Sequence, residues 1–166
     1  MADVKNVYPA STTLALTSAN ALASSSTFVA GAESAAYDNS VNLYLDVRVC
    51  GHLQVGTTPT TATQIQVWVA AENGDGSWPD VLDGTDSAET WTNAECRDAG
   101  ARLGAVINVI STTSNISYPF EIGSVAALFG GFMPKKFVLF VAHNTGVNLN
   151  ASNPTIDCHP RYETVT

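Results

Sequence analysis

The stretch LYLDVRVCGHLQV (residues 43–55) alternates apolar and polar side chains along its whole length. Leucine and valine at 43, 45, 47, 49, 53 and 55 share one face, and polar side chains share the other. A period of two residues is typical of a β-strand with one buried face. Gly51 interrupts the apolar face, so we expect a bulge or bend at that position.

The segments that flank this strand carry further strand patterns. TQIQVWVAAE (63–72) repeats the alternation, and GTTPTT (56–61) supplies turn residues, so we expect 43–72 to form an antiparallel pair. The segments 102–112 and 136–146 are apolar on both faces, which predicts cover by a loop or by a partner subunit. Residues 155–165 predict a closing strand, at an edge or bulged because of Pro160.

Helical signals are weak by comparison. The one helical turn that we expect runs from Ser124 to Phe129 and ends at two glycines. Residues 1–36 are small and weakly patterned, which predicts an extended N-terminal arm or an edge strand. The fold class is therefore all-β: an antiparallel β-sandwich or jelly roll, with residues 37–166 as a single domain and at most one short helical turn.

Composition limits the classes of function. Charged residues make up 13% of the 166 residues, and the net charge is −8. Lysine occurs only at 5, 135 and 136, so no basic stripe could neutralise phosphates, and we expect no direct nucleic-acid binding and no membrane attachment. Three widely spaced cysteines without a CxxC motif favour synthesis in a reducing compartment.

Residues 72–98 hold eight of the fifteen acidic residues. Asp80, Asp83 and Asp86 follow one another at intervals of three between two tryptophans. Clustered carboxylates favour Ca²⁺, but the EF-hand pattern fails because Trp78 stands where its glycine is required. The alternative is a solvated loop that is held by Asp-Gly turns and apolar anchors. The sequence leaves the Ca²⁺ site open as the less favoured hypothesis.

Other sites have less support. Cys50, His52, His143, Cys158 and His159 are residue types that bind zinc, but thiols in a β core are usually buried small hydrophobes. The motifs of nucleophilic, metal-dependent and nucleotide-binding enzymes are absent from the sequence, so we expect no enzyme. A carbohydrate-binding module is a second hypothesis, since exposed tryptophans would suit sugar binding; the three tryptophans are Trp68, Trp78 and Trp91.

Three segments together carry a resemblance. In residue pattern and in order along the chain, they are similar to small β-sandwich virion proteins of tailed bacteriophages. The segments are AESAAYDNSVNLYLDVRV, WPDVLDGTDSAET and FGGFMPKKFVLFVAHNTGVNLN. They resemble most the jelly-roll head decoration (cement) proteins. The resemblance implies a homotrimer on the outer surface of the virion capsid, made in the host cytoplasm, with the major capsid protein as its partner. It implies no catalytic residues.

The resemblance also directs attention to contact residues. An extended arm could thread along a neighbour, and FGGFMPKK carries the only paired bases of the chain. A solvated strand entry is the alternative interpretation of that lysine pair. Another tail or neck component would share this fold and composition. The expected contacts with the capsid or a second subunit are Tyr8, Leu14, Leu16, Phe28, Phe132, Lys135 and Lys136.

Overall fold

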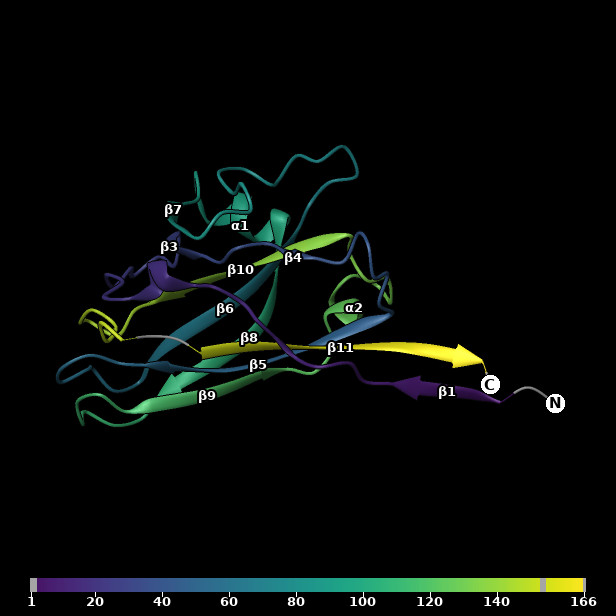
Figure 1. The fold of residues 1–166 in the computed structure, drawn as a ribbon. Coiled ribbons are helices and arrows are strands. Elements are labelled where there is room, and N and C mark those ends of the chain that lie inside the picture. The colour runs from purple at the N-terminus through teal and green to yellow at the C-terminus, as the bar shows by residue number, and fades with distance from the viewer. Residues whose placement is uncertain (1–2, 153–154, 166) are drawn as a thin grey trace.

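The structure is a computed structural model that describes residues 3–152 and 155–165, and it contains two antiparallel sheets packed face to face (Figure 1). The prediction of an all-β sandwich is confirmed. The first sheet has the order β1 (Val4–Val7), β11 (Thr155–Val165), β5 (Asp46–Gln54) and β9 (Ser117–Ile122), with β2 (Thr12–Thr13) paired to β11. The second has the order β7 (Ser87–Thr90), β3 (Ala30–Glu33), β10 (Lys136–His143), β6 (Thr63–Ala71) and β8 (Ala101–Val109), with β4 (Tyr37–Asp38) paired to β10.

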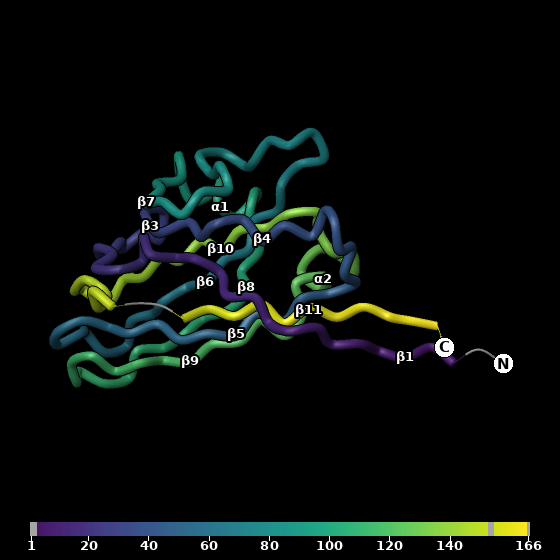
Figure 2. Tube along the Cα trace, viewed as in Figure 1, coloured from purple at the N-terminus to yellow at the C-terminus, as the bar shows by residue number. Residues whose placement is uncertain are grey.

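The strands β5 and β6 lie in different sheets, so the expected antiparallel pair over 43–72 is wrong. β5 pairs with β11 and β9, whereas β6 pairs with β10 and β8. The turn at 56–61 is an arch that carries the chain from one sheet to the other, as Figure 2 shows. Both strands still bury their alternating valines, because they face the same core from opposite sides.

The quoted strand is shorter than its sequence pattern. β5 begins at Asp46, and Leu43 and Leu45 remain 71% and 45% exposed, although the alternation places them on the buried face. Leu43 has a φ of 51°, which is not an extended conformation, so β5 cannot begin as early as the sequence pattern suggests. The expected bulge at Gly51 is also wrong, because pairing to β11 and β9 runs in register through it. A Cβ there would lie 2.7 Å from the Thr155 carbonyl oxygen, so glycine makes room for close packing.

The main core lies between the two sheets. Its strands contribute inward residues such as Val47 and Val49 from β5, Val67 from β6, and Leu139 from β10, all fully buried. A second core lies on the outer face of the second sheet, where Trp68, Val138 and Phe140 pack beneath residues 72–100. We call this segment the excursion. We expected both apolar faces of 136–146 to be covered, one of them by a loop or a partner. This is confirmed for β10, whose second face is covered by a loop.

β8 departs from that expectation because it is the edge strand of the second sheet. A register shift between Val67 and Trp68 leaves Gly104 as an extra residue in β8. The side chains after Gly104 therefore point to the opposite face from the one that strict alternation predicts. Ile107 and Val109 enter the main core, whereas Leu103 and Val106 stay 42% and 43% exposed. The structure therefore covers only one face of β8.

The helices differ in how well the sequence predicts them. The expected turn at 124–129 is present as α2 (Val125–Leu128), with the Ser124 hydroxyl accepting from Ala127 N at 3.0 Å. A second helix, α1 (Ala94–Gly100), was missed, so the limit of one helical turn is wrong. Asn93 caps α1 by accepting from Cys96 N at 2.7 Å. This cap was hidden inside a segment interpreted as an acidic loop.

The N-terminal segment is part of the sandwich beyond its first residues. β1 is an edge strand, as expected, and it pairs with the last residues of β11. Leu14 and Leu16 are buried in the main core, and both directly precede the 3₁₀ turn η1 (Thr17–Ala19). β3 lies inside the second sheet between β7 and β10. The extended arm therefore ends well before residue 36.

Pro160 lies within β11, at a position where its missing N–H leaves no partner strand without a hydrogen bond. β2 pairs with Asp157 and Cys158, and β1 begins to pair at Tyr162, so Pro160 sits in the gap between them. The alternation of backbone groups along β11 turns its missing N–H toward that gap. The proline thus fits a strand that is otherwise paired to β5 without a shift in register.

We expect Gly31→Ala to lower the free energy of unfolding by about 3 kcal/mol, because overpacking a filled interior forces backbone shifts. A Cβ at Gly31 would overlap the Val141 carbonyl oxygen and the Phe140 ring. Gly123→Ala is the matched control, since nothing lies within 4 Å of its added Cβ. Urea unfolding of both variants measures the difference, and equal stability would contradict this account of β3.

Candidate functional site

The acidic segment holds its carboxylates apart. Asp80 accepts from the N–H and hydroxyl of Thr92 at 2.7 and 2.8 Å, and Asp83 accepts from Thr85 N at 2.8 Å. Asp86 instead reaches the N-terminal segment. Within residues 3–152 and 155–165, no group of three or more His, Cys, Asp or Glu could hold a metal ion. The spacing that suggested Ca²⁺ thus does not bring Asp80, Asp83 and Asp86 together.

Asp86 fastens the acidic segment to η1. Its carboxylate accepts from Thr17 N at 2.6 Å, from the Thr17 hydroxyl at 2.7 Å and from Ser18 N at 2.9 Å. Burial disfavours the charged form of Asp86, but the hydrogen bonds from Ser18 and Thr17 outweigh it and lower the pKa. The carboxylate is thus a structural cap.

Glu33 provides a second attachment between the acidic segment and the rest of the fold, which the sequence did not reveal. It lies in β3, is fully buried, and accepts from Gly84 N at 2.7 Å and from Asp83 N at 3.2 Å. Burial raises the pKa of Glu33 to about 7, against the opposing effect of these N–H groups, and the nearby charges of Asp83 and Glu89 add to the rise. Small residues around Glu33 give no strand signal that would mark it as buried.

Arg97 joins α1 to the second core. Its guanidinium lies 4.4 Å from the ring centroid of Trp68 and donates to the Thr27 and Phe28 carbonyls at 3.1 and 2.8 Å. The side chain is only 8% exposed. These donors hold the residues around Phe28, so Phe28 packs against the second core rather than projecting outward.

Two of the three tryptophans are not available for sugar binding. Trp68 is 8% exposed and Trp91 is 1% exposed, where Trp91 meets the Phe140 ring edge-on at 5.9 Å. Trp78 is half-buried beside Gly84. The tryptophans therefore anchor the excursion over the sheet, and the hypothesis of a tryptophan platform loses its main support.

The cysteines and histidines are dispersed as well. Cys158 faces the main core, and burial raises its pKa to about 12. Cys50 pairs across strands with Asp157 and lies outside the core cluster. His143 is buried, with Nε2 donating to the Leu22 carbonyl at 3.0 Å, because a carbonyl can only accept. His52 and His159 are exposed, so the residue types considered for zinc do not meet.

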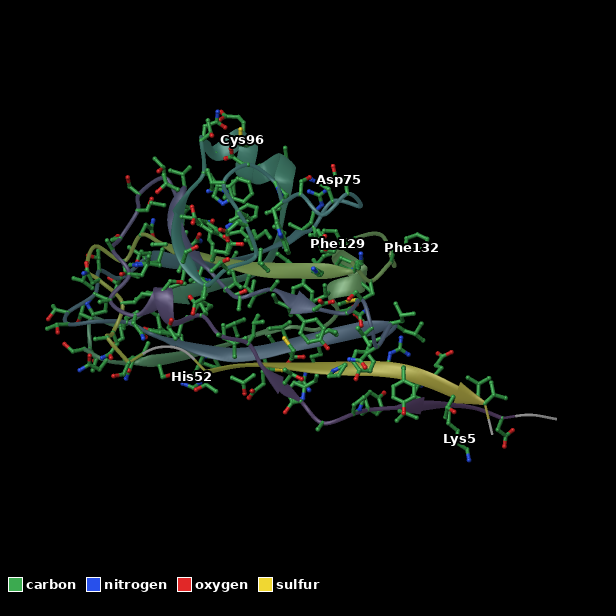
Figure 3. All side chains as sticks on the ribbon, turned by 45° about the horizontal axis from the view of Figure 1, so that its top comes forward. Lys5, His52, Asp75, Cys96, Phe129 and Phe132 are labelled. Atoms are coloured by element: carbon green, nitrogen blue, oxygen red, sulfur yellow. The ribbon has the colours of Figure 1, made fainter. Side chains whose placement is uncertain are left out.

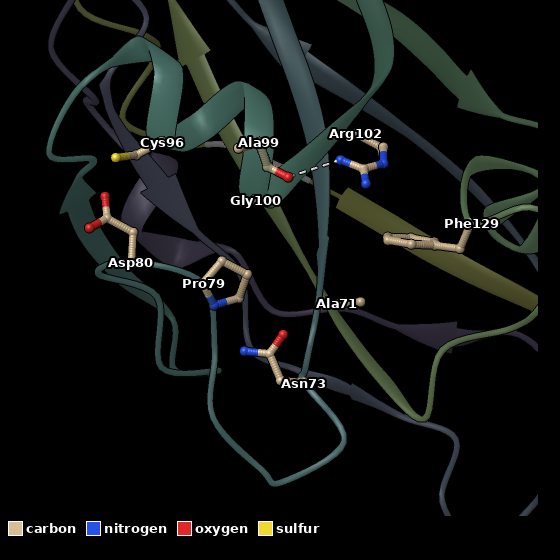
Figure 4. Close-up of a pocket in the computed structure, with 9 residues that line it drawn as sticks. All are labelled: Ala71, Asn73, Pro79, Asp80, Cys96, Ala99, Gly100, Arg102 and Phe129. Atoms are coloured by element: carbon tan, nitrogen blue, oxygen red, sulfur yellow. Dashed lines mark hydrogen bonds between the residues drawn. The ribbon is translucent and has the colours of Figure 1, made fainter.

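A hollow lies within the excursion, between residues 73–80 and α1, and Figure 4 shows its lining. It has a volume of about 570 Å³ and is open to solvent. Its charged side chains are Asp80, which is bonded to Thr92, and Arg102, which donates to the Ala99 carbonyl at 3.1 Å. The thiol of Cys96 lines it without a histidine among its neighbours in the lining. The lining offers no pair of nucleophile and base.

The predicted contact residues divide into exposed and buried sets. Tyr8 and Phe132 are 71% and 80% exposed, and Lys135 is exposed beside Phe132. Lys136 is half-buried, with its Nζ 3.9 Å from Asp38 and 4.0 Å from Glu72. Leu14 and Leu16 are buried within this chain, so their place in a free contact arm is wrong.

Exposed apolar side chains gather at one end of the sandwich. There the ribbon, which is β1 with residues 162–165 of β11, projects beyond the two sheets (Figure 1). The cap, which is residues 39–45 and 129–134, lies beside the base of the ribbon, and Figure 3 shows Phe132 and Lys5 at this same end. Tyr44 of the cap meets Tyr162 at 6.1 Å, and Leu45 N donates to the Arg161 carbonyl at 2.9 Å.

We name the ribbon, the cap and Tyr8, which directly follows β1, together the assembly end. The sequence signals for it were present but assigned elsewhere, since Leu43 and Leu45 were interpreted as core. Large apolar side chains that stay exposed in a continuous region mark contact surfaces. The exposed apolar residues of the assembly end are Val4, Tyr8, Val41, Leu43, Leu45, Phe132, Tyr162 and Val165.

No family model matches the chain, and no curated protein matches it either. In the described part of the chain, no helix is long and apolar enough to cross a membrane. Function must therefore be inferred from the assembly end itself and from the chemistry of the residues around it.

We expect Arg97→Met to lower the free energy of unfolding by about 3 kcal/mol. Methionine keeps much of the apolar stem but leaves the Thr27 and Phe28 carbonyls, in partly buried surroundings, without their donor. Arg48→Met is the control, because Arg48 is exposed and its ion pair with Glu121 lies at the surface. Chemical unfolding compares the two, and a larger loss in Arg48→Met would contradict the role given to Arg97.

We expect Glu33 to make the protein less stable as the pH rises. Its pKa is about 7 in the folded state against 4.5 as the ordinary value, so the folded state binds more protons between these pH values. The contribution of Glu33 is complete below pH 4.5 and is lost through pH 7, which amounts to about 3 kcal/mol. Buried His143, whose pKa is lowered from 6.5 by burial, acts in the opposite direction as the pH falls below that value.

The comparison of Glu33→Gln with the parent protein isolates the effect of Glu33. Urea unfolding at pH 5 and pH 8 should show the free energy of the parent falling, relative to the variant, by about 3 kcal/mol over this interval. Glu121→Gln is the control, since Arg48 lowers the pKa of Glu121 and places its titration below this interval. Parallel pH profiles for parent and Glu33→Gln would refute the assignment.

Proposed function

We propose that this chain is a virion structural protein of a tailed bacteriophage, a capsid decoration (cement) protein that binds the assembled shell as a homotrimer. The observation that carries the proposal is the assembly end, a concentration of exposed apolar side chains on a sandwich whose interior is filled. The resemblance of three segments to head decoration proteins supplies the particular class. The protein acts on the virion as a structural part, and its proposed role involves no catalysis and no cofactor.

Stabilisation of the shell follows from mass action. A protein that binds only the assembled shell lowers the free energy of that state relative to free capsid subunits. Copies tied together by symmetry bind with a high effective concentration after the first contact forms. The net charge of −8 keeps a densely repeated surface soluble.

The partner of the assembly end on the virion is the major capsid protein at the outer capsid surface. Phe132 and Tyr8 provide aromatic anchors, which dominate many protein interfaces. Lys135 is exposed next to Phe132 and suits an acidic face of the capsid protein. A tail or neck position would use the same surface, and the identity of the partner separates it from decoration.

We expect purified protein to sediment with empty shells assembled from the capsid genes of the same phage. Phe132→Asp should reduce the bound fraction at least tenfold, because it puts a charge into the apolar contact. Ile110→Asp is the matched control, since Ile110 is 79% exposed but directly follows β8 and lies outside the assembly end. Absence of binding to shells, together with binding to isolated tails, would replace decoration by a tail function.

A further inference from the structure

We infer that the ribbon of one copy packs on the cap of a second copy of this chain. The inference rests on the proposed function in that it names a partner for the same assembly end. It commits to contact between unlike surfaces, ribbon to cap, rather than cap to cap. Such head-to-tail contacts close into a ring when the rotation between copies permits it.

The ribbon is incomplete as a structural unit in a single chain. Residues Tyr162–Val165 pair with β1, whereas Thr155–Arg161 pair with β5. Beyond Arg161 the described pairing is therefore two-stranded, and two-stranded ribbons are marginally stable in water without further packing. Val4 and Val165, directly opposite each other, are 63% and 68% exposed. A surface on another molecule would supply the missing packing.

The cap is the matching surface, and the ribbon of its own chain leaves it uncovered. The Tyr44–Tyr162 contact joins the two only at the base of the ribbon. Val41 and Phe132 remain 85% and 80% exposed. A shallow hollow between residues 39–45 and 131–133 lies in the cap, with Leu43, Leu45 and Phe132 in its lining.

The area suits a contact between copies. From the exposed fractions, the cap together with Val4 and Val165 would bury on the order of 750 Å² of large apolar residues, since Tyr162 faces the other side of the ribbon, against the roughly 1,000 Å² that a specific interface needs. The rest would come from polar groups at the rim. In a closed ring every copy makes this contact twice, once with its ribbon and once with its cap, and Tyr8 stays outside the contact, where the capsid protein can reach it.

Charge also favours a second copy. The ribbon carries exposed Lys5 and Glu163, and the margin of the cap carries exposed Asp38 and Lys135. Glu163 and Asp38 lie 3.7 and 3.9 Å from Arg161 and Lys136 of the same chain, so neither surface presents a net charge that would repel the other. A strongly acidic chain repels its own copies at most of its surface, so a patch with balanced charge is where they can meet.

The test uses two variants that disable opposite surfaces. Val4→Asp places a charge on the ribbon, and Phe132→Asp places one on the cap; both side chains are exposed, so the sandwich should fold. Light scattering after gel filtration should give a multiple of 17.4 kDa for the parent and the single mass for each variant. Ile110→Asp should keep the parent mass, and circular dichroism checks folding of all four proteins.

Mixing the two variants decides between contact modes. The Val4→Asp copy keeps its cap and the Phe132→Asp copy keeps its ribbon, so the mixture should form one intact contact and a species of twice 17.4 kDa. Association of Val4→Asp alone would show cap-to-cap contact and overturn the inference. A parent protein that stays at 17.4 kDa at high micromolar concentration would overturn it too.

The outcomes separate this inference from the proposed function. A monomeric parent that still sediments with shells would refute ribbon-to-cap contact and leave decoration standing, with the capsid protein as the occupant of the assembly end. A parent that forms the ring but binds no shell would do the opposite.

Discussion

The outward face of β10 is apolar, and the sandwich depends on its being covered. Val138, Phe140 and Ala142 face away from the main core and are fully buried only because the excursion 72–100 lies over them. Each such side chain contributes about 2 kcal/mol when it leaves water. The excursion holds its position through polar fastenings at its margins, which are Arg97 on the Thr27 and Phe28 carbonyls, Glu33 on the 83–84 backbone, and Asp86 on η1. Four acids of this segment have a structural role, because Asp75, Asp80, Asp83 and Asp86 accept from backbone N–H groups that a loop leaves without strand partners.

The sequence predicted the individual strands better than their arrangement. Alternation identifies which face of β5 and β6 is buried, since that depends on neighbouring residues along one chain. It does not show which strands pair, because an arch between sheets and a hairpin within one sheet use the same turn residues at 56–61. The apolar residues on both faces of β10 correctly predicted that both faces are covered. The same prediction failed for β8, because the extra residue at Gly104 changes which of its side chains face the core.

The contacts of the acidic segment and the N-terminal residues were beyond sequence reasoning for a different reason. Glu33 and Gly84 are far apart in the chain, and their bond depends on how β3 is placed between β7 and β10. Nothing in the sequence around Arg97 marks it as buried, and only its position above Trp68 makes it part of a core. Leu14 and Leu16 have polar and small neighbours that hide their burial. The assembly end was partly visible in Phe132 and Tyr8, but Leu43 became part of it only once β5 was seen to start at Asp46.

The pairing of Val4 with Val165 brings the beginning and the end of the described chain side by side at the tip of the ribbon. A foreign domain fused to either terminus would therefore emerge at the same place, next to the assembly end. Its bulk would stand where a partner has to approach. The exposed turn at Asn73–Ser77 is closed by its own hydrogen bonds, including Asn73 N to the Ser77 carbonyl at 2.8 Å, and belongs to the excursion on the outer face of the second sheet. If the proposed contacts form at the assembly end, an internal insertion at that turn would display a cargo without obstructing them, whereas a terminal tag would stand in their way.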